Sequence, residues 1–357
     1  MRIAYGVHGY GRGHSSRALA VLPELTARHE VLVLASDDAY RALAGDYDVF
    51  RLPGLRYVLD ENGQRRPLPT IWRGTQVFFD ARTQGPAERL ICQRLEEFAP
   101  DVIVSDSETF THWAGRHMGI PRVTFDHFGV LVYCNWPMTG RQKLTAAAEA
   151  WFYRRYMAGE PQRKVIASFY DAPPKRPGVR VVGPVLREIV HHVRPAEGDY
   201  LLVYFSNGQR HYTPAVEKAL RALDTPVVIY GVGRAGTDGR LDYRPPSNTK
   251  FVEDLAAARA VFSTAGNQLI SEAVHLQKPL LLLPEDGLEQ HLNAQAIAKM
   301  GIGEGLDGHR VTADRLRGFL DRAEDYRGHF PPQRDGRAEA VAAIEEFAVE
   351  LTAPAGR

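Results

Sequence analysis

The chain has 357 residues, which exceeds one ordinary hydrophobic core and fits two domains of common size. Hydrophobic residues make up 44% of it and charged residues 24%, as in a globular enzyme, and a formal charge of +1 gives no overall attraction to nucleic acid. The two cysteines, Cys92 and Cys134, exclude a disulfide framework and a cysteine-rich metal cage.

The N-terminal segment gives no sign of export. Met1 to Tyr5 leads directly into a predicted strand, without the apolar stretch of a signal peptide. No apolar run approaches the roughly 20 residues that a membrane-spanning helix needs. Because the cysteine content also suits a reducing compartment, we expect a cytoplasmic protein.

The first predicted elements are a strand over 3–7, a glycine-rich loop, a helix over 15–28 and a strand over 31–35. This order opens a doubly wound α/β domain. The loop fails the dinucleotide fingerprint G-x-G-x-x-G, because His14 stands where the third glycine would be. The pattern therefore predicts an α/β fold and does not favour a dehydrogenase.

His14 is the first candidate catalytic residue. It follows Gly11 and Gly13, whose lack of a side chain lets the backbone approach a substrate. A histidine titrates near neutral pH, so it can take a proton from a hydroxyl group or from water. The plainer interpretation is a ring that bonds a backbone group at the start of the helix.

The segment from Gly54 to Asp80 shows no clear period, and we expect a solvated excursion with a turn at Asn62-Gly63. Its arginines interleave with Trp72, Phe78 and Phe79. The same mixture of basic and aromatic side chains would also suit part of a ligand-binding surface.

Two predicted strands in the middle of this domain end in polar residues. The carboxyl ends of parallel strands face the ligand crevice of such a fold. The first end, Asp106-Ser107-Glu108, resembles an Asp-x-Asp metal motif only loosely, and we expect no metal there. The second end carries Asp126 and His127, which are alternatives to His14 as general base. Simple surface polarity explains them equally.

Residues 133–164 mix aromatic and basic side chains, among them Trp151, Arg154 and Arg155. A basic amphipathic stretch with tryptophan can lie in a membrane interface. A helix that buries one face in its own domain accounts for the same composition. Both interpretations stay open.

The second half of the chain repeats the opening pattern. A predicted strand over 199–205 is followed by Ser206-Asn207-Gly208-Gln209 and then by a helix over 213–223. Arg187 lies in the connection before them, and a guanidinium suits phosphate. A surface arginine on a linker is the plain alternative.

Residues 251–303 carry the strongest signals. Ser263 to Asn267 place small residues before a helix, which leaves free N–H groups that favour a phosphate. Leu280 to Leu283 is an apolar run, as in a strand buried on both faces. Glu272 and the pair Glu289-Gln290 can accept hydrogen bonds from sugar hydroxyls. Phosphate donors beside hydroxyl acceptors suit a nucleotide-sugar.

This order resembles the donor-binding half of GT-B glycosyltransferases, especially the peptidoglycan GlcNAc transferase and the UDP-glucosyl and glucuronosyl transferases. Those families carry a Gly-Asn-x-x-x-x-Glu-like segment, then a proline, then an Asp-Gln-x-x-Asn-Ala box. The matching residues here are Gly266-Asn267, Glu272, Pro284 and Glu289-Gln290-x-x-Asn293-Ala294. Glutamate at 289 departs from the aspartate of the family.

The resemblance implies a GT-B fold, with two Rossmann-like doubly wound domains that face each other across a cleft. Residues 1–183 would form the N-terminal acceptor domain and 184–335 the C-terminal nucleotide-sugar donor domain. Residues 336–357 would form a helix that crosses back to the first domain.

The resemblance also implies a donor site. The backbone at Phe251 and Val252 would bind the uracil edge, Glu272 the ribose, and Glu289 with Gln290 the donor sugar. The full expected donor-binding set is Gly11, Gly13, Arg187, Ser206, Asn207, Gly208, Phe251, Val252, Thr264, Ala265, Gly266, Asn267, Glu272, Glu289, Gln290 and Asn293.

The function implied is an inverting, metal-independent glycosyltransferase that moves a sugar from a UDP-sugar, or as a second choice a dTDP-sugar, to an acceptor hydroxyl. The acceptor would be a small molecule, a glycan or a lipid-linked sugar, and no cofactor is expected besides the nucleotide-sugar. The segment Gly11-x-Gly13-His14-x-x-Arg17 also resembles nucleotide-sugar hydrolases of nonulosonic acid synthesis, in which the histidine activates water. A hydrolase is therefore the alternative, and a non-enzymatic nucleotide-sugar-binding protein is a third.

Overall fold

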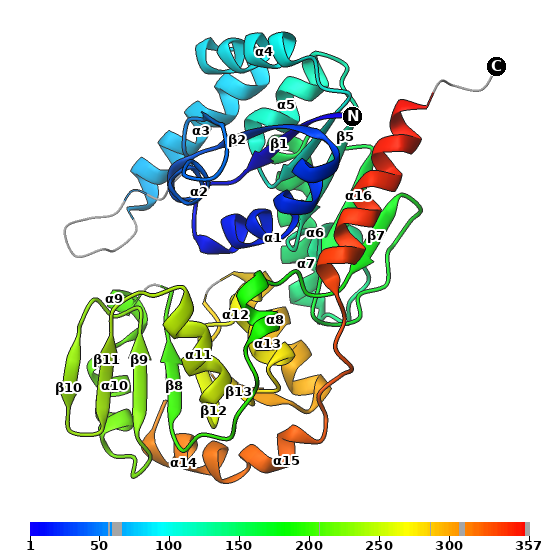
Figure 1. Ribbon diagram of the computed structural model, residues 1–357. Helices are drawn as coiled ribbons and strands as arrows, with labels where there is room; N and C mark the ends of the chain where they lie inside the picture. The colour runs from blue at the N-terminus through cyan, green and yellow to red at the C-terminus, as the bar shows by residue number, and fades with distance from the viewer. Residues whose placement is uncertain (56–57, 59–65, 207, 286, 307–310, 354–357) are drawn as a thin grey trace. The chain divides into compact units, whose positions relative to one another are not determined.

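The structure is a computed structural model that describes residues 1–55, 58, 66–206, 208–285, 287–306 and 311–353 (Figure 1). The chain divides into two compact units. The first consists of the described residues of 1–187 together with those from 334 onward, and the second of the described residues of 188–333.

The first unit contains a seven-stranded sheet in the order β3-β2-β1-β4-β5-β6-β7, and every neighbouring pair is parallel. The order reverses between β1 and β4, as in a doubly wound sheet. The strands are β1 (Arg2–Val7), β2 (Glu30–Ala35), β3 (Val49–Arg51), β4 (Val102–Asp106), β5 (Arg122–Asp126), β6 (Arg163–Ala167) and β7 (Val179–Val182).

The second unit repeats this plan in the order β10-β11-β9-β8-β12-β13-β14. Its pairs are parallel except that β10 runs antiparallel to β11. The strands are β8 (Leu201–Tyr204), β9 (Val227–Tyr230), β10 (Gly236–Asp238), β11 (Leu241–Arg244), β12 (Ala260–Ser263), β13 (Leu280–Leu282) and β14 (Gly303–Gly305). The two sheets confirm the predicted doubly wound α/β class.

Helices cover both faces of the first sheet. Helices α1 and α16 contribute to one core and α4 and α5 to another. The helices of this unit are α1 (Arg12–Arg28), α2 (Asp37–Leu43), α3 (Pro67–Thr83), α4 (Pro86–Phe98), α5 (Thr109–His117), α6 (Gly129–Tyr133), α7 (Gly140–Phe152), the π-helical turn η1 (Tyr153–Met157) and α16 (Gly336–Thr352).

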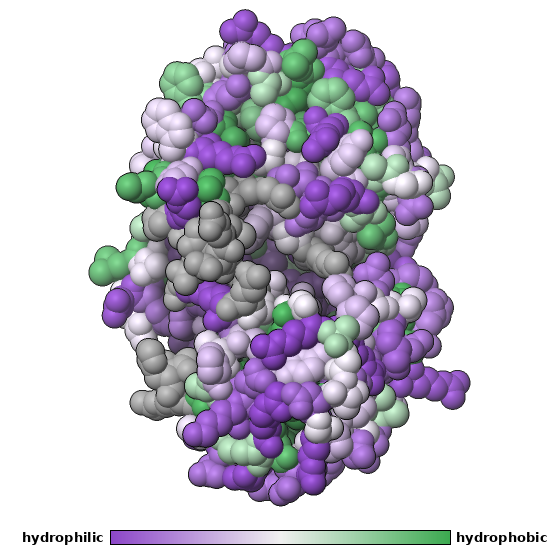
Figure 2. All heavy atoms as spheres, turned by 90° about the vertical axis from the view of Figure 1, so that its left-hand side faces the viewer, coloured by the Kyte–Doolittle hydropathy of each residue, from purple (hydrophilic) through white to green (hydrophobic). Residues whose placement is uncertain are grey.

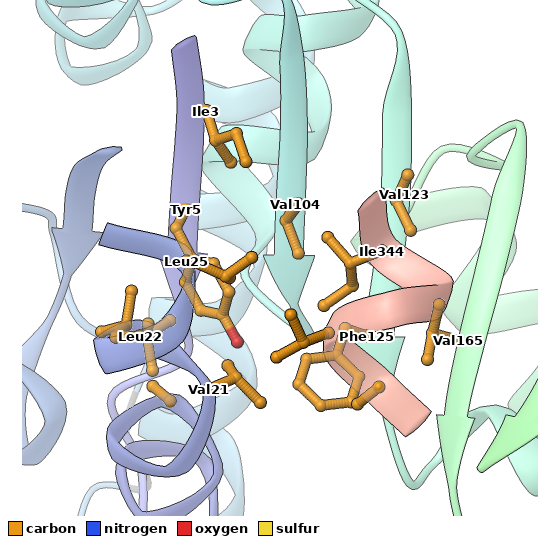
Figure 3. Packing of buried hydrophobic residues seen from close by; sticks show 14 of the residues in the cluster. Ile3, Tyr5, Val21, Leu22, Leu25, Val104, Val123, Phe125, Val165 and Ile344 are labelled. Carbon is orange, nitrogen blue, oxygen red and sulfur yellow. The ribbon is translucent and has the colours of Figure 1, made fainter. Parts of the chain in front are cut away.

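The core under α1 and α16 joins the two ends of the chain. Figure 3 shows Leu22 of α1 and Ile344 of α16 packed against strand residues such as Tyr5 and Phe125. Helix α16 has its buried residues at helical spacing, including Val341, Ile344 and Phe347, so one face enters the core. Residues more than 300 positions apart therefore share one core.

The core of the second unit combines β8, β9, β12 and β13 with α10 and α14. The apolar strand residues, such as Val203 and Phe262, are fully buried because helices cover the sheet. The helices are α8 (Glu188–His192), α9 (Gly208–His211), α10 (Pro214–Arg221), α11 (Thr249–Ala257), α12 (Asn267–His275), α13 (Leu288–Met300), α14 (Ala313–Asp321) and α15 (Ala323–Arg327).

Two segments differ from the sequence-based expectation. Most of the excursion expected from Gly54 onward is helix α3, which exposes several apolar side chains and so lacks a simple amphipathic pattern. Residues 231–239, for which no strand was predicted, contain β10, whose three residues are all exposed at the edge of the sheet and show no apolar alternation. The expected turn at Asn62-Gly63 lies outside the described residues.

Candidate active site

His14 lies in the first turn of α1 and contacts the end of β4. Its Nδ1 is 2.7 Å from Asp106 Oδ1. The Asp106 side chain is fully buried, whereas a quarter of the His14 side chain is exposed. A carboxylate that binds Nδ1 orients the imidazole and stabilises its charged form, which leaves Nε2 for proton transfer.

Arg17 holds the same carboxylate from the next turn of α1. Its Nε donates to Asp106 Oδ2 at 2.8 Å, and its Nη2 donates to Asp106 Oδ1 at 2.6 Å. Burial by itself raises the pKa of Asp106, but the charges of Arg17 and His14 outweigh it and keep this pKa below its ordinary value. Asp106 therefore stays ionised beside the imidazole.

A second histidine borders this pair. His8 follows β1, its backbone N–H donates to the Asp106 carbonyl at 3.1 Å, and its ring centre lies 5.0 Å from that of His14. Burial, with a smaller contribution from His14, lowers the pKa of His8 to about 3. His8 is thus neutral near pH 7 and adds no charge to the site.

Asp126 and His127, the alternatives to His14, have interior contacts. Asp126 is fully buried; its Oδ2 accepts from the Tyr153 hydroxyl at 2.5 Å and from Thr124 at 2.9 Å, and its Oδ1 accepts from the Gly129 N–H at 2.6 Å. His127 is 3% exposed, and its Nδ1 lies 2.7 Å from the Ala167 carbonyl. Both side chains hold the loop after β5 in place.

Gly11 and Gly13 lie at the start of α1 in the first unit. Gly11 has φ 84°, a conformation that favours glycine, and it immediately precedes the helix. Arg187 also belongs to the first unit and lies just before the chain enters the second. The other described residues of the expected donor set belong to the second unit, and Asn207 lies outside the described residues.

Polar side chains of the second unit meet at the carboxyl ends of β8, β12 and β13. The Ser206 hydroxyl lies 3.5 Å from that of Thr264 and donates to Glu285 Oε1 at 3.2 Å. Gln290 Oε1 accepts from the Glu285 N–H at 2.9 Å, and Asn293 Nδ2 donates to the Ala265 carbonyl at 3.0 Å. Two side chains of α13 therefore fix the loops that follow β12 and β13.

Glycines shape the same edge. A Cβ at Gly208 would lie 2.1 Å from the Gly231 carbonyl oxygen, so only glycine permits this approach of the β8 and β9 loops. Gly266 precedes α12, and Asn267 is its first residue. The first N–H groups of a helix lack intrahelical partners, which suits this point to an anion.

The residues expected at the sugar and ribose lie on two helices. Glu272 is 1% exposed on α12, and its Oε1 accepts from Gln268 Nε2 at 3.0 Å. Glu289 lies in the first turn of α13, one residue before Gln290.

The residues expected at the nucleobase, Phe251 and Val252, lie in the first turn of α11, which begins at Thr249. The Phe251 ring lies between two tyrosines, with centroids 5.4 Å from Tyr204 and 5.1 Å from Tyr230. Val252 is fully buried, so only its backbone is available to a ligand.

Several residues of these clusters were missing from the sequence-based list of site residues, among them Asp106 and Glu285. Asp106 had been considered only as part of a metal-like motif, and Glu285 not at all. In the sequence, only their position pointed to them, because Asp106 ends a buried apolar strand and Glu285 follows one. Among the described residues, no three His, Cys, Asp or Glu side chains are grouped so that they could hold a metal ion.

The comparisons with known proteins agree with this architecture. The family described as glycosyl transferase family 1 matches residues 1–323. Two doubly wound units with polar residues at the carboxyl edges of their sheets are the plan of a GT-B glycosyltransferase. The chain belongs to glycosyl transferase family 1, and it is a glycosyltransferase of GT-B fold.

Two archaeal relatives are similar in sequence. An uncharacterized glycosyltransferase of Methanosarcina acetivorans is 26% identical over 349 residues, which cover 86% of each chain. An uncharacterized glycosyltransferase of Methanopyrus kandleri is 24% identical over 194 residues, or 49% of this chain and 56% of that protein. The second match thus spans little more than half of the relative.

Solved structures share the fold over nearly the whole chain. The glycosyltransferase of kitacinnamycin has a TM-score of 0.67 at 20% identity and covers 99% of both chains. MurG of Acinetobacter baumannii has a TM-score of 0.60 at 16% identity, covering 97% of this chain and 99% of that one. At these identities the likeness shows the fold alone.

No helix within the described ranges has both the length and the apolar character needed to cross a membrane. Apolar residues (green) nevertheless lie among hydrophilic ones (purple) on the face shown in Figure 2. The exposed large apolar side chains of the first unit include Leu68 and Trp72 of α3 and Leu144 and Trp151 of α7.

Proposed function

We propose that the chain is an inverting, metal-independent glycosyltransferase that uses a UDP-sugar, with a dTDP-sugar as the second choice. The observation that carries this proposal is the pair of His14 and the buried Asp106. Inversion requires one base that takes the acceptor proton while the hydroxyl attacks the anomeric carbon. An imidazole fixed at Nδ1 by an ionised carboxylate has the chemistry of such a base.

The reaction then proceeds in one displacement. His14 takes the proton of the acceptor hydroxyl, the acceptor oxygen bonds to the anomeric carbon, and the bond from that carbon to the phosphate oxygen breaks. The nucleoside diphosphate leaves with the bonding electron pair. Asp106 stays ionised and stabilises the imidazolium, and Arg17 keeps Asp106 in position.

In this proposal the second unit binds the donor. Ser206, Thr264 and the N–H groups at the start of α12 contact the diphosphate, so that hydrogen-bond donors rather than a metal ion stabilise the charge that develops on it. Glu272 binds the ribose, Glu289 with Gln290 the sugar, and Phe251 the base. Arg187 and Asn207 stay proposed diphosphate contacts.

The test is a panel of UDP- and dTDP-sugars incubated with the enzyme in EDTA, first without acceptor and then with an acceptor library. We expect one donor to protect the enzyme against heat and to react only with an acceptor. We also expect NMR of the product to show an anomeric configuration opposite to that of the donor. Retained configuration, or activity that EDTA abolishes, would reject the proposed mechanism.

The same panel separates transfer from hydrolysis. Rapid nucleotide release without acceptor, lost in His14→Ala, would establish the nucleotide-sugar hydrolase, in which His14 activates water. Donor binding with no turnover across all acceptors would instead favour the non-enzymatic alternative.

We further propose that this cytoplasmic enzyme contacts membranes through residues 133–164. Leu144, Trp151 and Phe152 of α7 are 76%, 56% and 40% exposed, and their spacing of seven and eight residues puts them on one helix face. Exposed basic residues accompany them, among them Lys143 and Arg154. Apolar and cationic groups together suit the interface of an anionic bilayer, where a lipid-linked acceptor would lie.

Vesicle co-sedimentation tests this contact. The enzyme should sediment with phosphatidylglycerol vesicles and less with phosphatidylcholine alone, and a Leu144→Ser, Trp151→Ser variant should lose most of the binding. Leu90→Ser on α4, where the side chain is 62% exposed, is the matched control. Equal binding by all three proteins, or none by the wild type, would remove the membrane from the proposal.

A further inference from the structure

A contact between a histidine and a carboxylate that the proposed mechanism does not use lies at the carboxyl edge of the second sheet. His211 ends α9, and Glu285 follows β13 after a proline. The distance from His211 Nε2 to Glu285 Oε1 is 3.1 Å, and the two side chains are only 10% and 12% exposed. The same Oε1 accepts the hydrogen bond from Ser206. One carboxylate oxygen therefore holds two groups from the segment that follows β8.

The pair lies among residues of the proposed donor site. Strands β8, β12 and β13 are neighbours in the sheet, so the residues that follow them share one edge. Ser206 contacts both Thr264 and Glu285, and Gln290 binds the backbone of Glu285. The carboxylate of Glu285 thus lies where these hydroxyl groups would meet a diphosphate.

Two anions cannot share these partners at such short range, because like charges repel strongly where water is excluded. The contact between His211 and Glu285 is one in which a bound anion could replace the carboxylate. Its Nε2 has no hydrogen-bond partner among the described residues, since the approach to Glu285 is close but lacks hydrogen-bond geometry. The imidazole therefore lies close to the carboxylate but is not held there by a hydrogen bond.

We propose that Glu285 occupies the place of the donor phosphate in the empty enzyme, and that Ser206 and His211 transfer from Glu285 to the diphosphate when the donor binds. His211, in its protonated form, then stabilises the leaving group. This inference rests on the proposed function, because it takes the carboxyl edge of the second sheet to be the diphosphate site.

The chemistry assigns His211 a role distinct from that of His14. As the bond between the anomeric carbon and the phosphate oxygen breaks, its electron pair stays on the diphosphate, which becomes more negative. A cationic donor beside that oxygen binds the transition state more tightly than the substrate and so raises kcat. The proton taken from the acceptor goes to His14, and the proton on His211 stays where it is.

The inference predicts that substitutions at Glu285 and at His211 change ligand affinity in opposite directions. Glu285→Gln keeps the size of the side chain and an oxygen for Ser206 but removes the charge, so UDP and inorganic pyrophosphate should bind about tenfold more tightly. His211→Gln should weaken both ligands and lower kcat about 10²-fold, the usual size of a lost charge-stabilising donor. In the double variant, the gain from Glu285→Gln should shrink, because Glu285 and the ligand no longer compete for the imidazole of His211.

The control is Glu304→Gln. Glu304 is a partly buried carboxylate of the same unit that forms an ion pair with Arg322, on β14 and outside the proposed site. Its substitution should leave the affinity for both ligands unchanged. Circular dichroism and thermal unfolding of each full-length variant confirm that it folds.

Calorimetric titration of each variant with UDP and with pyrophosphate tests the inference. If the wild type binds them and Glu285→Gln binds no more tightly than wild type, the inference is overturned and the proposed function stands. An equal loss of affinity in His211→Gln and Glu304→Gln would also overturn it. If neither UDP, dTDP nor pyrophosphate binds the wild type at millimolar concentration, the proposed donor site fails and the inference fails with it.

Discussion

His14 and Asp106 come from segments 92 positions apart and meet as a hydrogen-bonded pair. The pair joins a partly exposed base to a fully buried carboxylate that is also held by Arg17. Each member therefore has a different function, and substitutions at the two positions should slow turnover for different reasons.

His14→Ala should lower kcat by about 10²–10⁴-fold and leave donor affinity near that of the wild type, because it removes the base and no donor contact. Asp106→Asn should lower kcat by a similar factor, since the amide no longer stabilises the imidazolium. Steady-state kinetics and donor titration of both variants provide the measurement. Near-normal turnover in His14→Ala, together with a large loss in His127→Ala, would move the base to the end of β5.

Glu88 gives a prediction about pH and stability. It is fully buried on α4, and its Oε1 lies 3.3 Å from His117 Nδ1. Burial, and next the nearby Glu108 and Asp80, raise its pKa from 4.5 to about 9. The folded protein thus holds a proton that the unfolded chain releases above about pH 4.5.

The contribution of Glu88 is therefore complete below about pH 4.5 and is lost as the pH rises towards 9, by at most about 1.4 kcal/mol per pH unit. Glu88→Gln cannot ionise, so its stability relative to the wild type should increase over that range. Denaturant unfolding at several pH values measures the difference. Parallel pH profiles of the two proteins would show that Glu88 ionises normally in the folded state.

At the scale of elements, the strands were easier to predict than the helices around them. Leu280 to Leu283 and Val102 to Ile103 are unbroken apolar runs, because each lies in a parallel sheet covered on both faces. Helix α3 was missed because its exposed Leu68 and Trp72 conceal the amphipathic period.

The residues of the candidate site could be predicted from the sequence only in part. His14 and Gln290 are readable from local motifs, whereas the contact of Glu285 with Ser206 joins residues 79 positions apart. Such a contact depends on strand order and loop geometry, which a single sequence does not state. The partial exposure of His14 and the complete burial of Asp126 are likewise properties of the folded chain.

Helix α16 offers a prediction about packing. Ile344 is fully buried in the core shown in Figure 3, and Ile344→Ala should destabilise the first unit by about 2–5 kcal/mol. Val349→Ala on the same helix, where the side chain is 60% exposed, should cost less than about 0.5 kcal/mol.

All four tryptophans of the sequence, at positions 72, 113, 136 and 151, belong to the first unit, so tryptophan fluorescence during denaturation reports on that unit. An equal shift of the transition in Ile344→Ala and Val349→Ala would mean that α16 adds little to this core.

At the scale of the whole molecule, the two units are built differently along the chain. The first is assembled from two separate segments, 1–187 and 334 onward, whereas 188–333 carries the core of the second without interruption. A fragment of residues 188–333 should therefore fold alone, since it contains its complete sheet and core.

The fragment should also bind UDP with an affinity within about tenfold of the full chain, because the proposed diphosphate contacts other than Arg187 lie inside it. Circular dichroism and calorimetric titration test both parts. A fragment that is unfolded, or folded but unable to bind UDP when the full chain does, would show that the second unit depends on the first.

Because α16 packs against the first sheet, the order of synthesis also determines when the core of the first unit can be completed. Ile344 and Phe347 complete the core over β1 and β4, yet the ribosome makes them after the whole second unit. At about 5–20 residues per second, the nascent first sheet waits roughly 10–30 seconds with one apolar face partly uncovered. During that interval the growing chain exposes the kind of surface that chaperones bind, until α16 has been translated and can cover it.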